Sequence, residues 1–317
     1  MKWKNLGIIF GKEDLKNIDK DIYFAKSPQT IVKKNSVIVY FTSQKKDKNN
    51  KWVSLPYFVE YSKDFSSILN FSKSPILDKG ALGTYDEHGI FPFSPSLINS
   101  KIYAFITGWS RRSSVDIEMS IGIAKSDDGY KFERLYEGPI LTSSLDEPFL
   151  VGDAFVRRYN EKLHMWYIYG DKWVNEDNHN DNSNPERSYR ISYASSIDGL
   201  KWHKESRYII DKVIENECQA LPSVVFHNNR YHLIFCYRNI FDFRNNKENS
   251  YKLGYASSID LKSWKRNDDC ISSIKSGSWD ENMQCYPHFC EVDDQLYCLY
   301  NGNEFGKAGF GIAKLEE

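Results

Sequence analysis

The sequence predicts an all-β protein, a five-bladed β-propeller whose blades are four-stranded antiparallel sheets. Three observations carry this prediction. The stretch 189–202 returns closely at 251–264, and looser copies occur at 58–65, 121–132 and 309–314. Each copy follows the same order of apolar runs and polar turns. Aromatic residues make up 15% of the chain, a composition that favours strands. Four-stranded sheets repeated around an axis form a propeller with short, protected edges.

A recurring small residue in the repeat sets the boundaries of the units. Ala124, Ala194, Ala256 and Ala313 stand in register, with Tyr61 at the same place in the first unit. We therefore predict a single domain over 1–317, with blades at about 20–75, 84–141, 147–211, 215–272 and 279–317. The last unit contains only three strands, so we expect the N-terminal strand 4–10 to supply the fourth and close the ring.

Charge and composition exclude several classes of partner. The chain has 42 basic and 43 acidic residues and no basic stripe, so we expect no nucleic acid partner. No apolar run approaches the ~20 residues of a membrane span, and the first one is too short for a signal peptide. We therefore expect a cytoplasmic protein with reduced cysteines. Nucleotide-binding glycine motifs and metal-ligand spacings are missing, so we expect no cofactor and no metal. Nothing in the sequence sets the oligomeric state.

The strand order predicts which face carries the chemistry. In an up-and-down sheet, the loops between the second and third strands share one face with the links between units. These connections are long and rich in charged and aromatic residues, whereas the turns on the opposite face are short. The links also precede the innermost strands, so they should surround the central channel. Function on loops held by a rigid scaffold is the usual arrangement.

Acidic residues recur in the links at similar distances before a proline of the inner strand. Paired carboxylates, one an acid and the other a base or nucleophile, are what glycosidic bond cleavage needs. The catalytic candidates are Asp86, Asp153, Glu217 and Glu281. We assign Glu217 as proton donor, Asp86 or Glu281 as base or nucleophile, and Asp153 as the residue that positions or tunes them. The alternative is that these acids are solvated or cap turns.

Basic, aromatic and amide side chains on the same face are candidates for substrate binding. The basic ones could hold an anionic group or neutralise the acidic ring, and the aromatic ones could stack on sugar rings or pack between blades. His88 is more simply explained as a hydrogen-bonded residue than as a metal ligand. The candidates are Lys26, Glu87, His88, Trp109, Arg111, Arg112, Lys172, Trp173, Arg238, Asp280, Gln284, Tyr286, Asn301 and Asn303.

Several segments carry a family resemblance, namely 25–28, 39–41, 83–89, 108–109, 193–202, 277–283, 285–287 and 299–303. They resemble the five-bladed β-propeller superfamily that includes glycoside hydrolase family 43. They look most similar to glycosidase-like propellers associated with bacterial surface-polysaccharide synthesis. The resemblance implies activity on glycosyl bonds. It also implies an aspartate as general base at the first inner strand, where this chain has Lys26 and no carboxylate.

The sequence therefore predicts a carbohydrate-active enzyme that acts on a glycosyl bond, by hydrolysis or transfer. Its ligand would be a carbohydrate in the central channel, and its role the synthesis or trimming of a bacterial surface glycan. Two alternatives remain. The basic residues on the face with the long loops suggest a glycosyltransferase-like enzyme with a nucleotide-sugar ligand. A non-catalytic glycan-binding propeller is suggested by the lysine in place of the first-blade base.

Overall fold

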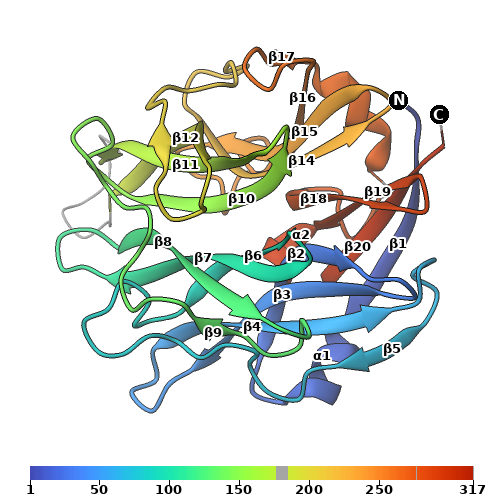
Figure 1. Ribbon diagram of the computed structural model, residues 1–317, viewed down its shortest axis with the longest axis horizontal. Coiled ribbons are helices and arrows are strands. Elements are labelled where there is room, and N and C mark those ends of the chain that lie inside the picture. Colours follow the sequence, from blue (N-terminus) through green and yellow to red (C-terminus); the bar gives the residue numbers. More distant parts are fainter. Residues whose placement is uncertain (176–184, 276, 317) are drawn as a thin grey trace.

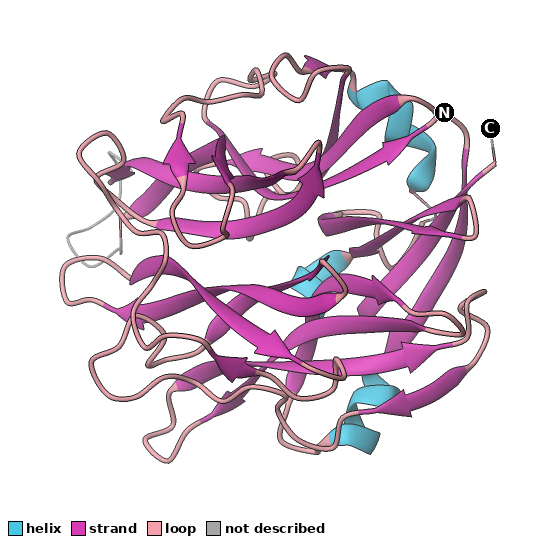
Figure 2. Ribbon diagram, viewed as in Figure 1, coloured by secondary structure: helices cyan, strands magenta, loops and turns pink. Residues whose placement is uncertain are grey.

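The computed structural model describes residues 1–175, 185–275 and 277–316, and it confirms the predicted fold class. Five four-stranded antiparallel sheets stand around a central axis as the blades of a propeller (Figure 1). In four blades the strands follow one another in sequence order from the axis outward, and in the fifth the N-terminal strand is outermost, as the repeats predict. The connections between them are short turns and loops, with little helix (Figure 2).

The first three blades contain strands β2 to β13. Blade I consists of β2 (Tyr23–Val32), β3 (Val37–Lys46), β4 (Trp52–Tyr61) and β5 (Ile68–Phe71). Blade II consists of β6 (Ile90–Ile98), β7 (Lys101–Arg111), β8 (Ile117–Ser126) and β9 (Glu133–Arg134). Blade III consists of β10 (Val151–Tyr159), β11 (Lys162–Val174), β12 (Glu186–Ser196) and β13 (His203–Lys204).

The last two blades close the ring. Blade IV consists of β14 (Glu217–His227), β15 (Arg230–Asn239), β16 (Lys252–Ser258) and β17 (Lys265–Arg266). Blade V consists of β18 (Cys285–Val292), β19 (Gln295–Asn301), β20 (Gly309–Leu315) and the N-terminal strand β1 (Trp3–Gly11). Strand β1 pairs antiparallel with β20, with Trp3 opposite Leu315, which confirms the predicted closure.

The core lies between blades rather than within one layer. Each blade is covered on both faces by its neighbours, so its middle strands are buried on both sides and read as continuous apolar runs. In β3, every residue from Val37 to Ser43 is buried. The helical segments are α1 (Lys12–Ile18), a 3₁₀ segment (Asp268–Ile274) and α2 (Asn303–Gly306). Within the described ranges, none of these helices has the length and apolarity to cross a membrane.

Candidate functional site

The innermost strand of every blade carries a β-bulge at the same place. The pairing register shifts after Lys26, Ile90, Gly152, Ala220 and Cys285. A bulge inserts an unpaired residue and re-aims its side chain. Four bulges hold a non-glycine residue in the left-handed region, and the fifth contains the cis peptide Phe91–Pro92. The left-handed residues are Ser27, Asp153, Leu221 and Tyr286, with φ of 55°, 54°, 51° and 56°.

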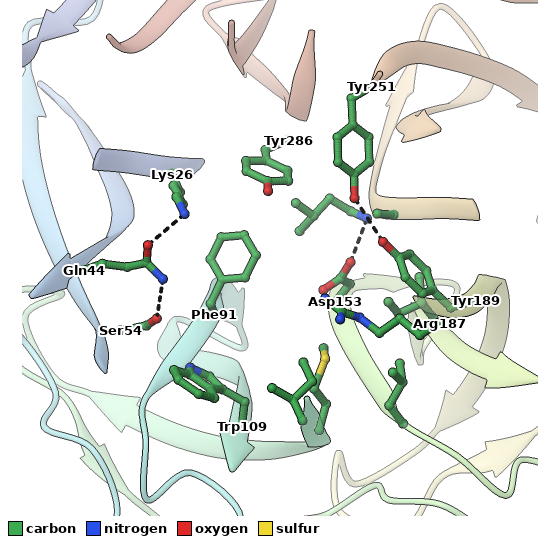
Figure 3. A pocket seen from close by; sticks show the side chains of 16 residues that line it. Lys26, Gln44, Ser54, Phe91, Trp109, Asp153, Arg187, Tyr189, Tyr251 and Tyr286 are labelled. Atoms are coloured by element: carbon green, nitrogen blue, oxygen red, sulfur yellow. Dashed lines mark hydrogen bonds between the residues drawn. The ribbon is translucent and has the colours of Figure 1, made fainter. Parts of the chain in front are cut away.

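The bulges surround a pocket on the axis. Its volume is about 250 Å³, and residues at the bulges of all five inner strands line it (Figure 3). The aromatic rings of Phe91, Trp109 and Tyr286 form much of its wall. Pockets that bury drug-sized ligands measure roughly 300–1,000 Å³. The size therefore suits a single ring with a substituent better than a long chain.

Asp153 contributes the only carboxyl group among the described residues that line this pocket. Its backbone N–H donates to Oγ1 of Thr107 at 2.9 Å, and its Oδ2 accepts the backbone N–H of Leu221 at 3.1 Å. Burial raises the pKa of Asp153 to about 7, against the opposing effects of the Leu221 N–H and the Arg187 charge. Both protonation states are therefore populated near neutral pH, as a general acid or base requires.

Lys26 reaches the pocket from the opposite side (Figure 3). Its Nζ donates to Oε1 of Gln44 at 3.0 Å, and Nε2 of Gln44 donates to Oγ of Ser54 at 3.4 Å. All three residues line the pocket. Burial lowers the pKa of Lys26 to about 8. The pocket thus has a carboxyl group at one end and an amine at the other, with aromatic rings between them.

A buried tyrosine pair forms another part of the wall. The hydroxyl groups of Tyr189 and Tyr251 lie 3.0 Å apart, and both residues line the pocket. Behind them, Arg238 is 1% exposed and donates to both phenol oxygens, at 3.3 Å from Nε and 3.2 Å from Nη2. Burial raises the pKa of Tyr251, so the pair keeps its protons. The predicted role of Arg238 in substrate contact needs correction, because the guanidinium lies behind the pocket wall.

Asp86 and Glu217 do not line the pocket, so the predicted convergence of the acidic links on the channel is wrong. Asp86 is fully buried in an ion pair with Arg134, at 2.5 Å between Oδ2 and Nη2. Glu217 is 1% exposed and pairs with Arg266, at 2.7 Å between Oε1 and Nη1. A buried carboxylate needs a charged or hydrogen-bonded partner. Here the partner comes from the outermost strand of the same blade, which turns the acid away from the axis.

Blade III repeats this arrangement with Glu147 and Lys204, whose Oε2 and Nζ lie 2.5 Å apart. We call the three ion pairs Asp86–Arg134, Glu147–Lys204 and Glu217–Arg266 the blade clasps. Their basic residues pair across the ladder with Ala124, Ala194 and Ala256, the alanines that mark the repeat. A clasp therefore ties the link that enters a blade to the strand that ends it.

The other acidic candidates also lie away from the pocket. Glu281 is exposed and lines a separate groove beside Lys247 and Gln284. Asp280 is 1% exposed, and its Oδ2 accepts the Tyr300 hydroxyl at 2.7 Å and the Gln284 amide at 3.2 Å. Of the four proposed catalytic carboxylates, the structure brings only Asp153 to the axis.

Trp109, in strand β7, reaches the pocket. His88 stacks on it with ring centroids 5.7 Å apart, and its Nδ1 accepts the backbone N–H of Arg111 at 3.3 Å. Burial, followed by the Arg111 charge, lowers the pKa of His88. Glu87 accepts the backbone N–H of Gly83 at 2.9 Å. His88 therefore supports the tryptophan ring, and neither His88 nor Glu87 lines the pocket.

The remaining binding candidates have structural contacts or face solvent. The side chain of Arg111 donates to the Trp52 carbonyl, and Arg112 pairs with Glu118. Lys172 is exposed and Trp173 is half-buried. Asn301 is fully buried and donates to the carbonyls of Ala25 and Gly309 at 2.7 Å, and Asn303 accepts the backbone N–H groups of Asn282 and Met283 at 3.0 Å. Within the predicted binding set, Lys26, Trp109 and Tyr286 line the pocket.

A local signal in the sequence marks the pocket more directly than the acidic links do. Ser27, Phe91, Leu221 and Tyr286 each precede a proline of an inner strand, and Asp153 holds the same register before Ala154. The residue before a proline is kept out of the right-handed helical region, which suits a bulge. Counting back one residue from these prolines finds four of the five bulges. The sequence analysis also missed the polar pocket residues Gln44, Ser54, Arg187, Tyr189 and Tyr251.

Sequence comparison identifies relatives of this chain. Two uncharacterised proteins of Mycobacterium tuberculosis, MT1551 and Rv1502, are each 30% identical to it over 252 residues, covering 78% of this chain and 79% of theirs. The chain belongs to their family. No protein-family model matches the sequence of this family member.

Solved structures resemble the fold of this chain. A protein described as a glycoside hydrolase has a TM-score of 0.73 at 15% identity, covering 99% of this chain and 91% of its own. The β-1,2-mannobiose phosphorylase from Listeria innocua has a TM-score of 0.68 at 13% identity, covering 99% and 96%. A glycoside hydrolase of family GH130 has a TM-score of 0.63 at 14% identity, covering 92% and 84%. At these identities the likeness shows the propeller fold alone.

Proposed function

We propose that this protein is a carbohydrate-active enzyme that acts on a glycosyl bond in the axial pocket, with Asp153 as the proton donor. The observation that carries the proposal is the placement of Asp153. Its carboxyl group is buried at the axis, its pKa is raised to about 7, and aromatic rings flank it. Aromatic faces pack well against sugar rings, and a carboxyl group protonated near neutrality can protonate a leaving oxygen. The carbohydrate-active proteins among the structural neighbours support the same class.

The surroundings of Asp153 suit proton transfer to a glycosidic oxygen. Burial favours the neutral acid before the reaction, which provides the proton at neutral pH. The Leu221 N–H and the Arg187 charge favour the carboxylate, so they stabilise the product of proton transfer. The Leu221 N–H also fixes the carboxyl orientation. These opposing effects keep both states accessible to one side chain.

The lack of a second carboxylate among the described lining residues bears on the fate of the glycosyl group. Two-carboxylate hydrolysis requires partners roughly 5–5.5 Å or 6.5–9.5 Å apart. Two of the carboxylates proposed from the sequence, Asp86 and Glu217, are held in blade clasps. We therefore favour transfer to an acceptor that brings its own nucleophile over simple hydrolysis. One structural neighbour is named as a phosphorylase, which supports this choice.

The biological setting in this proposal is the synthesis or trimming of a bacterial surface glycan. Its support is the resemblance carried by segments such as 83–89 and 277–283. Deletion of the gene in its source organism should change the composition of the surface glycan. An unchanged glycan composition would refute the proposed role in surface-glycan synthesis or trimming. It would not affect the proposal that the protein is an enzyme.

The decisive experiment is a screen of glycosides, with water, phosphate and sugar acceptors, for release of the leaving group. Turnover should fall by about 10²–10⁴-fold in Asp153→Asn, the usual contribution of a general acid. Asp127→Asn, at an exposed turn of blade II, is the matched control and should keep the wild-type rate. Full turnover in Asp153→Asn would refute the assignment. Glycan binding without turnover in any acceptor series would instead support the non-catalytic binding alternative.

A further inference from the structure

The Lys26 end of the pocket is rich in hydrogen-bond donors. Lys26 uses one of its three N–H groups on Oε1 of Gln44, and Gln44 uses one amide N–H on Oγ of Ser54. The other N–H groups of Lys26 and the Ser54 hydroxyl have no acceptor among the described residues. The Gln44 oxygen already accepts from the lysine. This end of the pocket therefore offers a ligand several hydrogen-bond donors and few acceptors.

The charge at this end is also unmatched. Within the described ranges, no carboxylate lies within ion-pair distance of Lys26, and burial is the main influence on its pKa. Its Nζ lies 4.2 Å from the ring centroid of Phe24, a contact that favours the cation without neutralising it. Lys26 is half-buried, and a cation withdrawn from water is costly unless a counter-charge pairs with it. The missing partner is therefore expected from the ligand.

The opposite end differs because its cation has a carboxyl group close by. Arg187 lies beside Asp153 (Figure 3), and its charge opposes part of the rise that burial causes in the pKa of Asp153. Lys26 lies across the pocket, with Phe91 between the two ends (Figure 3). A sugar ring that places its glycosidic oxygen at Asp153 would direct a distant substituent toward Lys26.

We propose that Lys26, Gln44 and Ser54 form a subsite for an oxyanion group, a carboxylate or a phosphate, carried by the sugar in the pocket. The inference rests on the proposed function, because it takes a sugar as the occupant, and it specifies the substrate class as acidic sugars. Ammonium and hydroxyl donors around a desolvated site are the usual recognition elements for such groups.

Matched ligands test this subsite by titration calorimetry. Methyl glucuronide and methyl glucoside differ only in carrying a carboxylate or a hydroxymethyl group, and a hexose 6-phosphate and inorganic phosphate complete the set. We expect a sugar with an anionic group to bind about tenfold or more tightly than the neutral sugar. Lys26→Met should abolish that difference, and Lys26→Arg should keep part of it. Lys101→Met, at the exposed start of β7, should change nothing.

A second measurement keeps the test independent of whether Lys26→Met folds. Lysine side chains of the wild-type protein are dimethylated with ¹³C, and the resonance of Lys26 is followed by NMR. Anionic ligands should shift this resonance. They should also raise the pKa of Lys26 above the value of about 8 that it has in the ligand-free protein. A resonance unmoved by every anionic probe, with equal affinities for charged and neutral sugars, would overturn the subsite.

The outcomes separate this inference from the proposed function. Lys26-dependent binding of inorganic phosphate, with no binding of any sugar, would support the oxyanion site and count against a glycan substrate. Turnover of neutral glycosides that depends on Asp153 but not on Lys26 would support the function and refute the subsite. Binding of the charged sugar alone, lost in Lys26→Met, would support both.

Discussion

The Oε1 atom of Glu217 lies 2.7 Å from Nη1 of Arg266, inside blade IV and away from the axial pocket. The same carboxylate accepts the backbone N–H of Val213 at 2.9 Å through its other oxygen. These contacts hold the link that enters the blade against the strand that ends it. An acidic residue that sequence alone places among catalytic candidates is thus part of the scaffold, and the predictions below separate the two roles.

Glu217→Gln should destabilise the protein by about 1–3 kcal/mol, because Arg266 would lose one of its two carboxylate partners and keep only Asp268. Chemical denaturation measures this loss. Glu215→Gln, at an exposed position of the same link, should have no effect. The double variant Glu217→Gln/Arg266→Met should lose less stability than the sum of its two single variants. Wild-type stability in Glu217→Gln, together with lost turnover, would return this residue to the catalytic set.

Asp153→Asn should change the pH dependence of stability. The folded-state pKa of Asp153, about 7, lies above the ~3.9 of an unfolded aspartate, so the native state holds an extra proton between these values. Wild-type stability should therefore fall as pH rises from 4 through 7, by on the order of 4 kcal/mol in total. Asp153→Asn should lack this loss and be more stable than wild type at pH 8. Parallel denaturation profiles of the two proteins over this range would contradict the pKa shift.

Tyr251→Phe should cost about 1–3 kcal/mol of stability, because Nε of Arg238 would lose its buried acceptor. The phenol oxygen of Tyr251 also lies 3.0 Å from that of Tyr189, so the loss disturbs both members of the pair. Thermal unfolding with Tyr136→Phe as control checks this, since Tyr136 is 52% exposed. Equal melting temperatures for the two variants would show that Arg238 does not depend on the tyrosine.

His288 should make the fold sensitive to acid. It is fully buried, accepts the backbone N–H of Thr30 at Nε2, and contacts Ser223 through Nδ1. Burial, followed by the Arg157 charge, holds its pKa well below the usual range. The unfolded chain takes up a proton below pH ~6.5 and the native state does not. The free energy of unfolding should therefore decrease as the pH is lowered, by up to about 1.4 kcal/mol per pH unit. Denaturation of wild type and His288→Gln between pH 7 and 5 isolates this contribution, and identical slopes would contradict it.

The sequence repeat was sufficient to predict much of the architecture. Ala124, Ala194 and Ala256 lie at equivalent positions of their blades, and β1 closes blade V as the missing fourth strand required. These inferences succeed because strand alternation and turn residues are local properties. A blade buried on both faces also leaves a continuous apolar run in the sequence.

The candidate site was predicted less well, because packing between segments distant in the sequence determines which side chains face the pocket. Asp86 and Asp153 are both acidic residues at the entrance to an inner strand, yet one pairs with Arg134 and the other stands in the pocket. The partner that decides the difference lies 48 residues further along the chain in the case of Asp86. Spacing from a proline cannot show that partner.

The sequence by itself determined the five-bladed fold, the closing strand and the placement of Lys26 in a region where a carboxylate was expected. The tertiary structure decided which acidic side chain faces the axis. It placed Asp153 beside Leu221 and Lys26 beside Gln44, and it turned Asp86 and Glu217 into the blades. The physical reason is that burial and charge pairing depend on what surrounds a side chain in space, and those surroundings exist only once the ring is closed.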